Sequence, residues 1–289
     1  TAVVGGRSVG APGVLRMLAQ AHAQHGKLPW ASLFAPAIAL AHQGFAMSPR
    51  LHAQLKADAY LRLDPAARAY FYQASGEPHA IGHVLRNPEL AAVLQRIAVE
   101  GVQAFYQGEV AEAVVRKVQQ HPSNPGRLAL SDLANYQAKE RTPVCFDHAA
   151  VSRVYRVCGF PPPSSGAIAI GQILGMLQHT PASLMSSPTE TADGTPDPRW
   201  LHLYTEASRL AFADRALYVA DPDFVPAPSG EWQSLLAPAY LRERAKLIRP
   251  TAMPQALPGT PVRAQRSSFA PMAAQPEFGT SHISIVDGW

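Results

Sequence analysis

Thr280 is the residue whose type and position carry the clearest chemical implication in this sequence. A threonine hydroxyl is a weak nucleophile unless a base lies beside it, and the α-amino group of the same threonine can be that base. With a reference pKa of about 7.7–8.0, this amine is partly neutral near physiological pH and accepts the hydroxyl proton. Because the amine exists only at a chain start, the peptide bond between Gly279 and Thr280 must first be cut. Gly279 favours such a cut, since without a Cβ its carbonyl is easily approached.

The residues around Thr280 also fit a plain structural interpretation. A glycine-threonine pair in front of a strand is most often a turn, and from these residues alone we rank the turn first. In the strand that follows, Ile283 and Ile285 would face one side and His282 the other. His282 would share a face with Thr280, and we interpret it as a packing or hydrogen-bonding residue because the threonine amine already serves as base.

Two other hydroxyl-bearing sites are weaker candidates. Thr1 offers the same chemistry, but we interpret it as the arbitrary start of a fragment. Ser164 and Ser165 are not part of the Gly-x-Ser-x-Gly elbow of a serine hydrolase; they follow three prolines and precede an apolar stretch. We therefore predict a structural turn and a helix N-cap at these two serines.

The histidines and the charged pairs favour structural roles. His22 and His25 share a helix face, but no His-Glu-x-x-His array or carboxylate cluster accompanies them, so we expect solvated surface. Glu206 and Arg209 have the i,i+3 spacing of an ordinary helical ion pair. The Asp-Pro-Asp run at 221–223 is expected to form a hydrogen-bonded turn rather than a cation site.

Composition limits the class of protein. The chain has 289 residues, enough for one large domain or two ordinary ones. Its formal net charge is +4 and its basic residues are scattered, so no nucleic-acid partner is expected. Charged residues make up 16%, against about 25% in typical domains, which predicts that other protein covers part of the surface. No segment approaches the roughly 20 apolar residues of a membrane span.

Two cysteines, Cys145 and Cys158, exclude a disulfide-dense scaffold and a cysteine-based zinc site. Two half-buried thiols are the preferred interpretation, and a disulfide between them stays open.

Prolines and glycines divide the chain into predicted elements. Helices are predicted at 12–25 and 36–43, from 49, from 88, at 109–118, from 166 to 177 and at 198–219. Ser48 and Asn87 are predicted N-caps, because each places a side-chain oxygen before a proline at the first helical position. The helix from 88 should bury a stripe of Leu90, Val93, Leu94 and Ile97. Short strands are predicted at 144–146, 154–157 and 280–287, and an irregular proline-rich tether at 249–278.

Several segments, in a consistent order across nearly the whole chain, resemble the γ-glutamyltranspeptidase (glutathione hydrolase) family. The runs 161–166 (PPPSSG) and 280–287 (TSHISIVD) are the specific ones, and the others add weight mainly through their order. These others are 8–13 (SVGAPG), 26–30 (GKLPW), 36–38 (PAI), 44–45 (GF), 105–109 (FYQGE), 130–136 (LSDLANY), 140–143 (ERTP), 213–215 (ADR) and 221–224 (DPDF).

The resemblance implies an α+β fold: the αββα sandwich of N-terminal-nucleophile hydrolases in the parent protein, with this fragment mainly helical and with a few strands. It implies that Thr280 attacks the carbonyl of Gly279 and that the resulting ester is hydrolysed. Residues 1–279 would then be a large-subunit portion with a proline-rich tether at 249–279, and residues 280–289 the start of a small subunit.

The same resemblance implies the chemistry of the freed Thr280. Its hydroxyl would take the γ-glutamyl group of glutathione or another γ-glutamyl compound and pass it to water or to the amine of an acceptor amino acid or peptide. No metal or organic cofactor is implied. The implied partner is the small subunit from the same precursor, and the implied location is periplasmic or secreted.

Departures from the family pattern keep alternatives open. The arginine that binds the substrate carboxylate normally lies upstream of a segment like 8–13, and Arg7 is too close to that segment to be equated with it. The oxyanion glycines belong to the small subunit, and Ala167 replaces a second glycine often found after the PPPSSG run. A cephalosporin acylase-like amidase of the same family is one alternative, and a non-catalytic helical partner subunit is another. The fragment alone is expected to be inactive.

Overall fold

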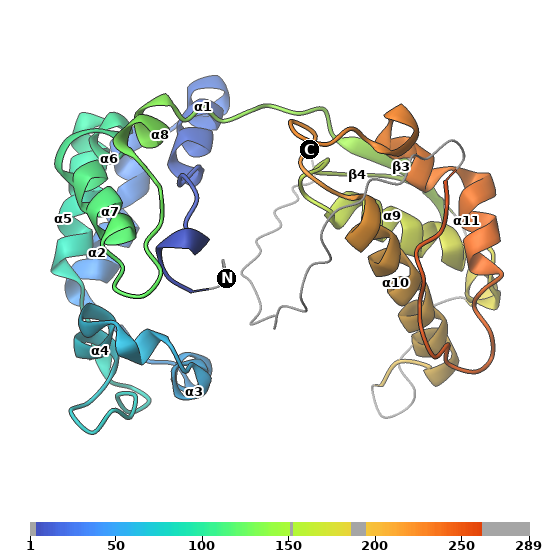
Figure 1. The fold of residues 1–289 in the computed structure, drawn as a ribbon, viewed down its shortest axis with the longest axis horizontal. Coiled ribbons are helices and arrows are strands. Elements are labelled where there is room, and N and C mark those ends of the chain that lie inside the picture. Colours follow the sequence, from blue (N-terminus) through green and yellow to red (C-terminus); the bar gives the residue numbers. More distant parts are fainter. Residues whose placement is uncertain (1–3, 151–152, 186–194, 262–289) are drawn as a thin grey trace. The chain divides into compact units, whose positions relative to one another are not determined.

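The computed structural model describes residues 4–150, 153–185 and 195–261. The chain forms two compact units, residues 1–139 and residues 140–289, and each has a hydrophobic core of its own. Both units are mainly helical, and within the described residues strands occur in two short two-stranded sheets (Figure 1). This agrees with the mainly helical fragment with a few strands that the sequence predicts. None of the helices in these ranges is long and apolar enough to cross a bilayer.

The first unit is a series of helices joined by short turns. They are α1 (Val14–His25), α2 (Ala35–Gln43), α3 (Pro49–Ala57), α4 (Pro65–Phe71), α5 (Pro88–Glu100), α6 (Gln103–Tyr106), α7 (Gly108–Gln119) and α8 (Leu130–Asn135), with 3₁₀ turns at Gly6–Ser8, Trp30–Phe34 and Leu61–Leu63. Strands β1 (Phe45–Ala46) and β2 (Val84–Leu85) pair antiparallel. The five helices predicted in this half correspond to α1, α2, α3, α5 and α7, whereas α4, α6 and α8 were not predicted.

Three helices of the first unit begin with a side-chain cap followed by proline. Ser48, Asp64 and Asn87 each accept a hydrogen bond from the backbone N–H three residues on, at 2.9–3.1 Å. Proline follows each cap and costs no hydrogen bond, because that N–H has no partner inside the helix. The caps predicted at Ser48 and Asn87 are confirmed. The Lys117 ammonium, paired with Asp64, lowers the pKa of that carboxyl.

The buried face of α5 differs from the predicted stripe. Ile97 is buried as predicted, but Leu90 is 46% exposed and the small residues Ala91 and Ala98 are buried. The helix packs closely against α2, and alanines allow such a close approach. The prediction for Leu90 was wrong because a period of 3.6 residues does not fix which of two adjacent faces is covered.

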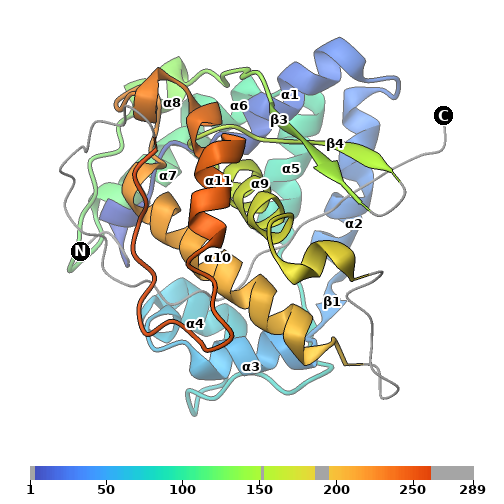
Figure 2. The same cartoon turned by 90° about the vertical axis from the view of Figure 1, so that its right-hand side faces the viewer.

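The second unit is built around α9 (Figure 2). Its helices are α9 (Gly166–Leu177), α10 (Pro198–Tyr218) and α11 (Pro238–Ala245), its strands β3 (Val144–Ala149) and β4 (Val154–Gly159), and its 3₁₀ turns Pro181–Leu184, Pro228–Gly230 and Trp232–Leu236. The apolar helix α9 contacts the β3–β4 hairpin, α10 and α11, and buries Ile168, Ile173 and Met176 among them. The predictions for β3, β4, α9 and α10 are confirmed, and α11 was missed.

The β3–β4 hairpin carries a disulfide between Cys145 and Cys158. The antiparallel register places the two residues directly opposite each other, with their Cα atoms 4.1 Å apart. Phe146 packs against Gly171 of α9, so the cysteines, at alternating positions, lie on the other face of the hairpin. The preferred prediction of two thiols was wrong, because the register that pairs the cysteines could not be read from their spacing.

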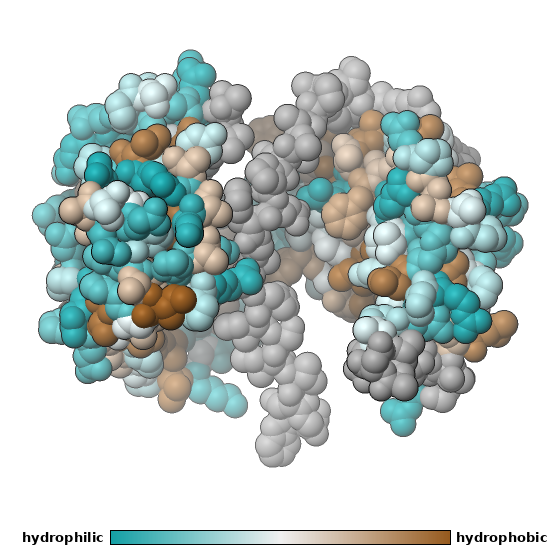
Figure 3. All heavy atoms as spheres, turned by 90° about the horizontal axis from the view of Figure 1, so that it is seen from below, coloured by the Kyte–Doolittle hydropathy of each residue, from teal (hydrophilic) through white to brown (hydrophobic). Residues whose placement is uncertain are grey.

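Residues 249–261 form no helix or strand, as the sequence predicts, and they lie alongside α10 (Figure 2, red). The rest of the predicted tether, 262–278, and the predicted strand at 280–287 lie outside the described residues. Apolar side chains also reach the surface: Phe160, Leu184 and Phe224 are each more than 80% exposed. Figure 3 shows apolar atoms among hydrophilic ones on the face that it presents. Apolar side chains exposed one at a time are common on protein surfaces, so the coverage of the chain by other protein stays a prediction.

Candidate functional site

The predicted nucleophile and cleavage position are not among the described residues. Thr280, Gly279 and His282 lie beyond residue 261, and Thr1 precedes residue 4. What the structure describes is the segment 249–261, which comes before the predicted junction in the chain, and the side chains that hold it. The site is therefore built from this segment outward.

Side chains in the first half of α10 bind the backbone of this segment. Nε2 of His202 lies 2.7 Å from the carbonyl oxygen of Arg249. One oxygen of Glu206 accepts the N–H of Met253 at 2.8 Å, and its other oxygen accepts Arg209 Nη1 at 2.9 Å. Arg209 also donates to the carbonyl of Met253. The predicted ion pair of Glu206 with Arg209 is confirmed, and it holds a piece of backbone that the sequence did not predict.

The second half of α10 continues the same series of contacts. Asp214 accepts the N–H of Gly259 at 2.8 Å, and the Tyr218 hydroxyl donates to the carbonyl of Gly259 at 2.7 Å. Residues early in α10 thus bind the start of the segment, and residues late in α10 bind its end. The segment therefore runs parallel to the helix over most of its length. A chain without regular structure is thereby given fixed partners for its backbone groups.

Asp214 is the centre of a buried polar network. It is 0% exposed and accepts four hydrogen bonds, from Gln172 Nε2, the Tyr240 hydroxyl, Arg244 Nη2 and the N–H of Gly259, at 2.7–2.9 Å. Each carboxylate oxygen accepts two of them, which offsets the cost of taking the charge out of water. Burial raises the pKa of Tyr240 and the neighbouring Asp214 carboxylate raises it further, so the phenol stays protonated and donates.

The two serines of the PPPSSG run have structural roles. Ser164 closes a turn by donating its N–H to the carbonyl of Pro161 at 3.1 Å. Ser165 stands at the N-cap position of α9, but it makes no side-chain cap; its Oγ instead accepts Arg215 Nε at 2.7 Å. The guanidinium of Arg215 is already protonated and cannot accept the proton of the Ser165 hydroxyl. Arg215 therefore cannot act as a base that activates Ser165. The predicted turn is confirmed and the predicted capping bond is wrong.

The Asp-Pro-Asp run forms the hydrogen-bonded turn that the sequence predicts, with the N–H of Asp223 donating to Asp221 Oδ1 at 3.0 Å. Arg141 adds a partner that was not predicted: its Nη2 lies 3.0 Å from Asp223 Oδ1 and 3.8 Å from Asp221 Oδ1. The guanidinium lies close to both carboxylates and balances their negative charge without a metal cation.

In the first unit, Tyr106 joins three of the motif segments. Its hydroxyl donates to the carbonyl of Pro12 at 2.6 Å, and its ring stacks with Tyr136 at 6.4 Å between centroids. The guanidinium of Arg16 lies over the same ring, 4.4 Å from its centroid. Tyr106 therefore links the segments 8–13, 105–109 and 130–136 to one another.

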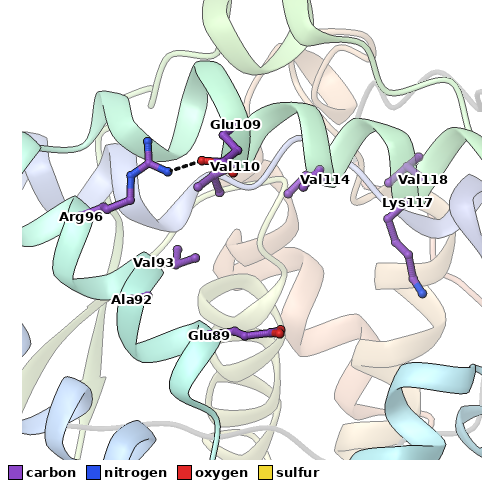
Figure 4. Close-up of a pocket in the computed structure, with 10 residues that line it drawn as sticks. Glu89, Ala92, Val93, Arg96, Glu109, Val110, Val114, Lys117 and Val118 are labelled. Carbon is purple, nitrogen blue, oxygen red and sulfur yellow. Dashed lines mark hydrogen bonds and ion pairs between the residues drawn. The ribbon is translucent and has the colours of Figure 1, made fainter.

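A hollow of about 670 Å³ lies between α5 and α7 (Figure 4). Val93, Val110 and Val114 give it an apolar wall, and an ion pair of Arg96 with Glu109 at 2.9 Å joins the two helices. Its lining residues contain no hydroxyl, thiol or imidazole, and the polar side chains among them are Glu89, Arg96, Glu109 and Lys117.

The two histidines of α1 differ in their surroundings. His25 is exposed as predicted, whereas His22 is half-buried and its Nε2 lies 2.8 Å from the carbonyl oxygen of Leu28. Among the residues that the structure describes, no group of three or more His, Cys, Asp or Glu side chains could hold a metal ion.

The motifs can be compared with known proteins. A sequence model of the gamma-glutamyltranspeptidase family matches residues 1–289. The chain belongs to this family. The glutathione hydrolase proenzyme of Pseudomonas aeruginosa is 34% identical over 285 residues, which are 99% of this chain and 45% of that protein. The chain thus spans about half the length of the curated relatives that it matches.

Solved structures of gamma-glutamyltranspeptidase relatives share the fold. The gamma-glutamyltranspeptidase of Helicobacter pylori matches with a TM-score of 0.73 and 29% identity, over 90% of this chain and 71% of that chain. A cephalosporin acylase from Bacillus halodurans matches with a TM-score of 0.69 and 28% identity, over 89% of this chain and 45% of that chain. These matches confirm the predicted α+β fold class of N-terminal-nucleophile hydrolases. The family match confirms the prediction that the chain belongs to a family of hydrolases.

Sequence reasoning missed the partners that link the gamma-glutamyltranspeptidase motifs. Asp214 and Arg215 belong to the segment 213–215 inside the predicted helix 198–219, but their contacts with Gly259 and Ser165 were not predicted. The sequence did contain one indication of these partners, because each of them lies in a motif segment: Ser165, Arg215, Arg141 and Asp223.

Proposed function

We propose that the complete protein is a γ-glutamyltransferase/glutathione hydrolase made as a precursor that cleaves itself between Gly279 and Thr280. The Thr280 hydroxyl adds to the Gly279 carbonyl, the C–N bond breaks, and the freed α-amino group of Thr280 takes up the proton. Water then hydrolyses the ester and leaves a carboxylate on Gly279. Residues 1–279, with the tether at 249–279, would be the large-subunit portion, and residues 280–289 would begin the small subunit that is its partner.

In turnover, the Thr280 amine accepts the hydroxyl proton while the oxygen attacks the γ-glutamyl amide of glutathione or a related compound. The amine of the leaving group takes that proton, and a γ-glutamyl ester stays on the threonine oxygen. Water or the amine of an acceptor amino acid or peptide then attacks the ester carbonyl and frees the hydroxyl. These steps use groups of the protein and its substrates, with no metal or organic cofactor.

One observation carries this proposal: the family match runs through residues 279 and 280 as far as residue 289. Relatives named glutathione hydrolase proenzyme support both the substrate class and the processing. The disulfide between Cys145 and Cys158 supports a periplasmic or secreted location, because disulfides persist in oxidising compartments.

The test is the intact mass of the complete gene product before and after incubation. We expect two pieces that separate between Gly279 and Thr280, together with release of the anilide product from a γ-glutamyl anilide. Thr280→Ala should abolish both, whereas Thr280→Ser, which keeps a hydroxyl, should still be cut at the same bond. Cleavage elsewhere, or full activity of the Thr280→Ala protein, would overturn the proposal.

Two other candidate functions have distinct outcomes in the same experiment. The similarity to a cephalosporin acylase favours a related amidase, which would be cut at the same bond but would prefer an acylated cephalosporin over the γ-glutamyl anilide. A non-catalytic helical partner subunit would stay in one piece with full helix content. Both substrates should therefore be offered to one preparation.

The 289-residue chain alone is predicted to be inactive. Negative charge develops on the attacked carbonyl oxygen during cleavage and turnover, and it needs preorganised donors. In the family, these groups and the arginine that binds the substrate carboxylate lie in parts that have no counterpart in this sequence. We expect neither self-cleavage nor anilide release from this chain, and detection of either by mass spectrometry or absorbance would contradict this.

A further inference from the structure

We propose that Cys158 is a site of reversible modification by low-molecular-weight thiols, which open its disulfide with Cys145 while the chain stays folded. Glutathione, the substrate of the proposed function, is one such thiol. The inference goes beyond that function, because the exchange needs neither the cleavage after Gly279 nor the hydroxyl of Thr280.

The β3–β4 hairpin turns one face toward α9 and the other face away from it. On the face toward α9, Val144 is 2% exposed, and Phe146 and Gly159 lie against the helix. Side chains alternate along a strand, so Cys145 and Cys158 point to the opposite face. The disulfide therefore lies outside the packing between the hairpin and α9.

The face that carries the disulfide is accessible in the described part of the chain. Cys158 is exposed and Cys145 is half-buried. Val154, on the same face of β4 as Cys158, is 69% exposed. Exchange begins when a thiolate attacks one sulfur of a disulfide, so its rate depends on access to that sulfur, and exposed disulfides are the labile ones. The sulfur of Cys158 is therefore the expected point of attack.

The charges beside the disulfide allow thiols of either charge to approach. Asp147 and Arg156 are the next cross-strand pair on this face, and they are ion-paired at 3.5 Å, so their charges offset each other. Neither an anionic thiol such as glutathione nor an uncharged one meets a net repulsion there. The site should accept thiols as a class.

The exchange balances with the thiol as its only co-reactant. The thiolate sulfur bonds to Sγ of Cys158, the bond between the two Sγ atoms breaks, and its electron pair leaves with Sγ of Cys145. Cys145 then takes up the proton that the incoming thiol released. The products are a mixed disulfide at Cys158 and a thiol at Cys145, and attack of this thiol on the mixed disulfide reverses the step.

The hairpin has other interactions that hold it when the disulfide is open. Its backbone pairing extends over six residue pairs, from Val144 with Gly159 to Ala149 with Val154. Its packing against α9 involves the opposite face and is untouched by the exchange. The reaction is therefore a modification of the folded protein and does not require unfolding.

The experiment treats the complete natural protein with reduced glutathione under native conditions, stops the exchange with acid at early times, and maps the adduct by peptide mass spectrometry. We expect one glutathione on Cys158 and a free thiol on Cys145, with an unchanged circular dichroism spectrum. An adduct on Cys145 instead would overturn the inference. So would the absence of any adduct or free thiol until denaturant is added.

Single-cysteine variants of the complete protein supply a matched pair. Cys145→Ser keeps the exposed Cys158, and Cys158→Ser keeps the half-buried Cys145. With oxidised glutathione under native conditions, Cys145→Ser should take up one glutathione faster than Cys158→Ser, and in denaturant the two rates should become equal. Equal rates under native conditions would contradict the assigned point of attack.

Thr280→Ala separates this inference from the proposed function. If the proposed function holds, this variant does not turn over glutathione, yet it should still form the adduct on Cys158. An adduct on Cys158 together with full γ-glutamyl turnover in Thr280→Ala would mean that the proposed function alone has failed. Loss of turnover in Thr280→Ala without an adduct in either protein would mean that this inference alone has failed.

Discussion

Arg215 Nε donates a hydrogen bond of 2.7 Å to Ser165 Oγ, and this bond joins the C-terminal part of α10 to the first turn of α9. The two residues belong to separate motif segments, PPPSSG and ADR, that are 50 residues apart in the chain. A second pair of segments is joined in the same way by Arg141 and Asp223. In this unit the motif segments of the gamma-glutamyltranspeptidase family therefore lie in contact as pairs.

The bond between Ser165 and Arg215 makes a first prediction. Ser165→Ala removes the acceptor and leaves Arg215 Nε, which is half-buried, without its partner. We expect the free energy of unfolding to fall by about 1–2 kcal/mol, the usual cost of an unsatisfied polar group in such a place. Denaturation in urea, followed by circular dichroism, measures this change.

The matched control is Ser164→Ala at the exposed neighbouring serine. Ser164 closes the turn through its backbone N–H, which an alanine retains, so the free energy of unfolding should change by less than about 0.5 kcal/mol. Equal effects of the two substitutions would show that the Arg215 bond adds nothing to stability.

Local signals predicted much of the helical structure. Ser48 and Asn87 were recognised as caps because a cap and the proline after it act within a few residues. The short helix α11 was missed because it depends on packing against α9, with Tyr240 and Leu241 in the core. Leu90 was misplaced because the buried face of a helix is chosen by its neighbours rather than by its own pattern.

Asp214 gives a second prediction. In Asp214→Asn an amide nitrogen replaces an oxygen that accepts two donors, and Arg244 loses its counter-charge in a buried position. Breaking a buried ion pair by removing one partner typically costs about 3–5 kcal/mol, and we expect a loss of that size in the free energy of unfolding.

The control for Asp214 is an exposed ion pair in the same unit. Asp147 and Arg156 are paired at 3.5 Å on the β3–β4 hairpin, and both side chains are more than half exposed. Asp147→Asn should change the free energy of unfolding by less than about 1 kcal/mol, because solvent screens such a pair. A loss at Asp214 no larger than this would mean that the buried network is not held together by its charge.

The candidate site could be predicted from sequence only as separate segments. Glu206 and Arg209 were paired correctly because i,i+3 spacing is local to one helix. That they hold Met253 could not be predicted, since 44 residues separate Arg209 from Met253 and the segment has no period to interpret. For Thr280 the assignment depends on the family match, because the residue type alone favours a turn.

The cap at Asp64 makes a prediction about pH. Its pKa is lowered in the folded chain, first by the hydrogen bond from Lys117 and then by that from the Ala67 N–H. A lowered folded pKa means that the unfolded chain binds the proton more readily. The stability from this cap is therefore full above the unfolded pKa of about 3.9 and is lost as the pH falls through the lower, folded value.

Asp64→Asn tests this sign. Asparagine caps a helix about as well as aspartate but does not titrate, so between pH 5 and pH 2 the variant should lose less stability than the natural protein. Thermal unfolding at several pH values measures the difference. Identical pH profiles would show that the charge on Asp64 does not contribute to stability.

The disulfide makes a prediction about chemical state. A protein with the Cys145–Cys158 bond should resist alkylation by iodoacetamide under denaturing conditions until a reductant is added, and should then take up two labels. Replacing both cysteines by serine should lower the free energy of unfolding by about 3 kcal/mol, because a bond across 13 residues restricts the unfolded chain by that amount. Two labels without reductant would instead mean free thiols, and would remove the support that the bond gives to an oxidising location.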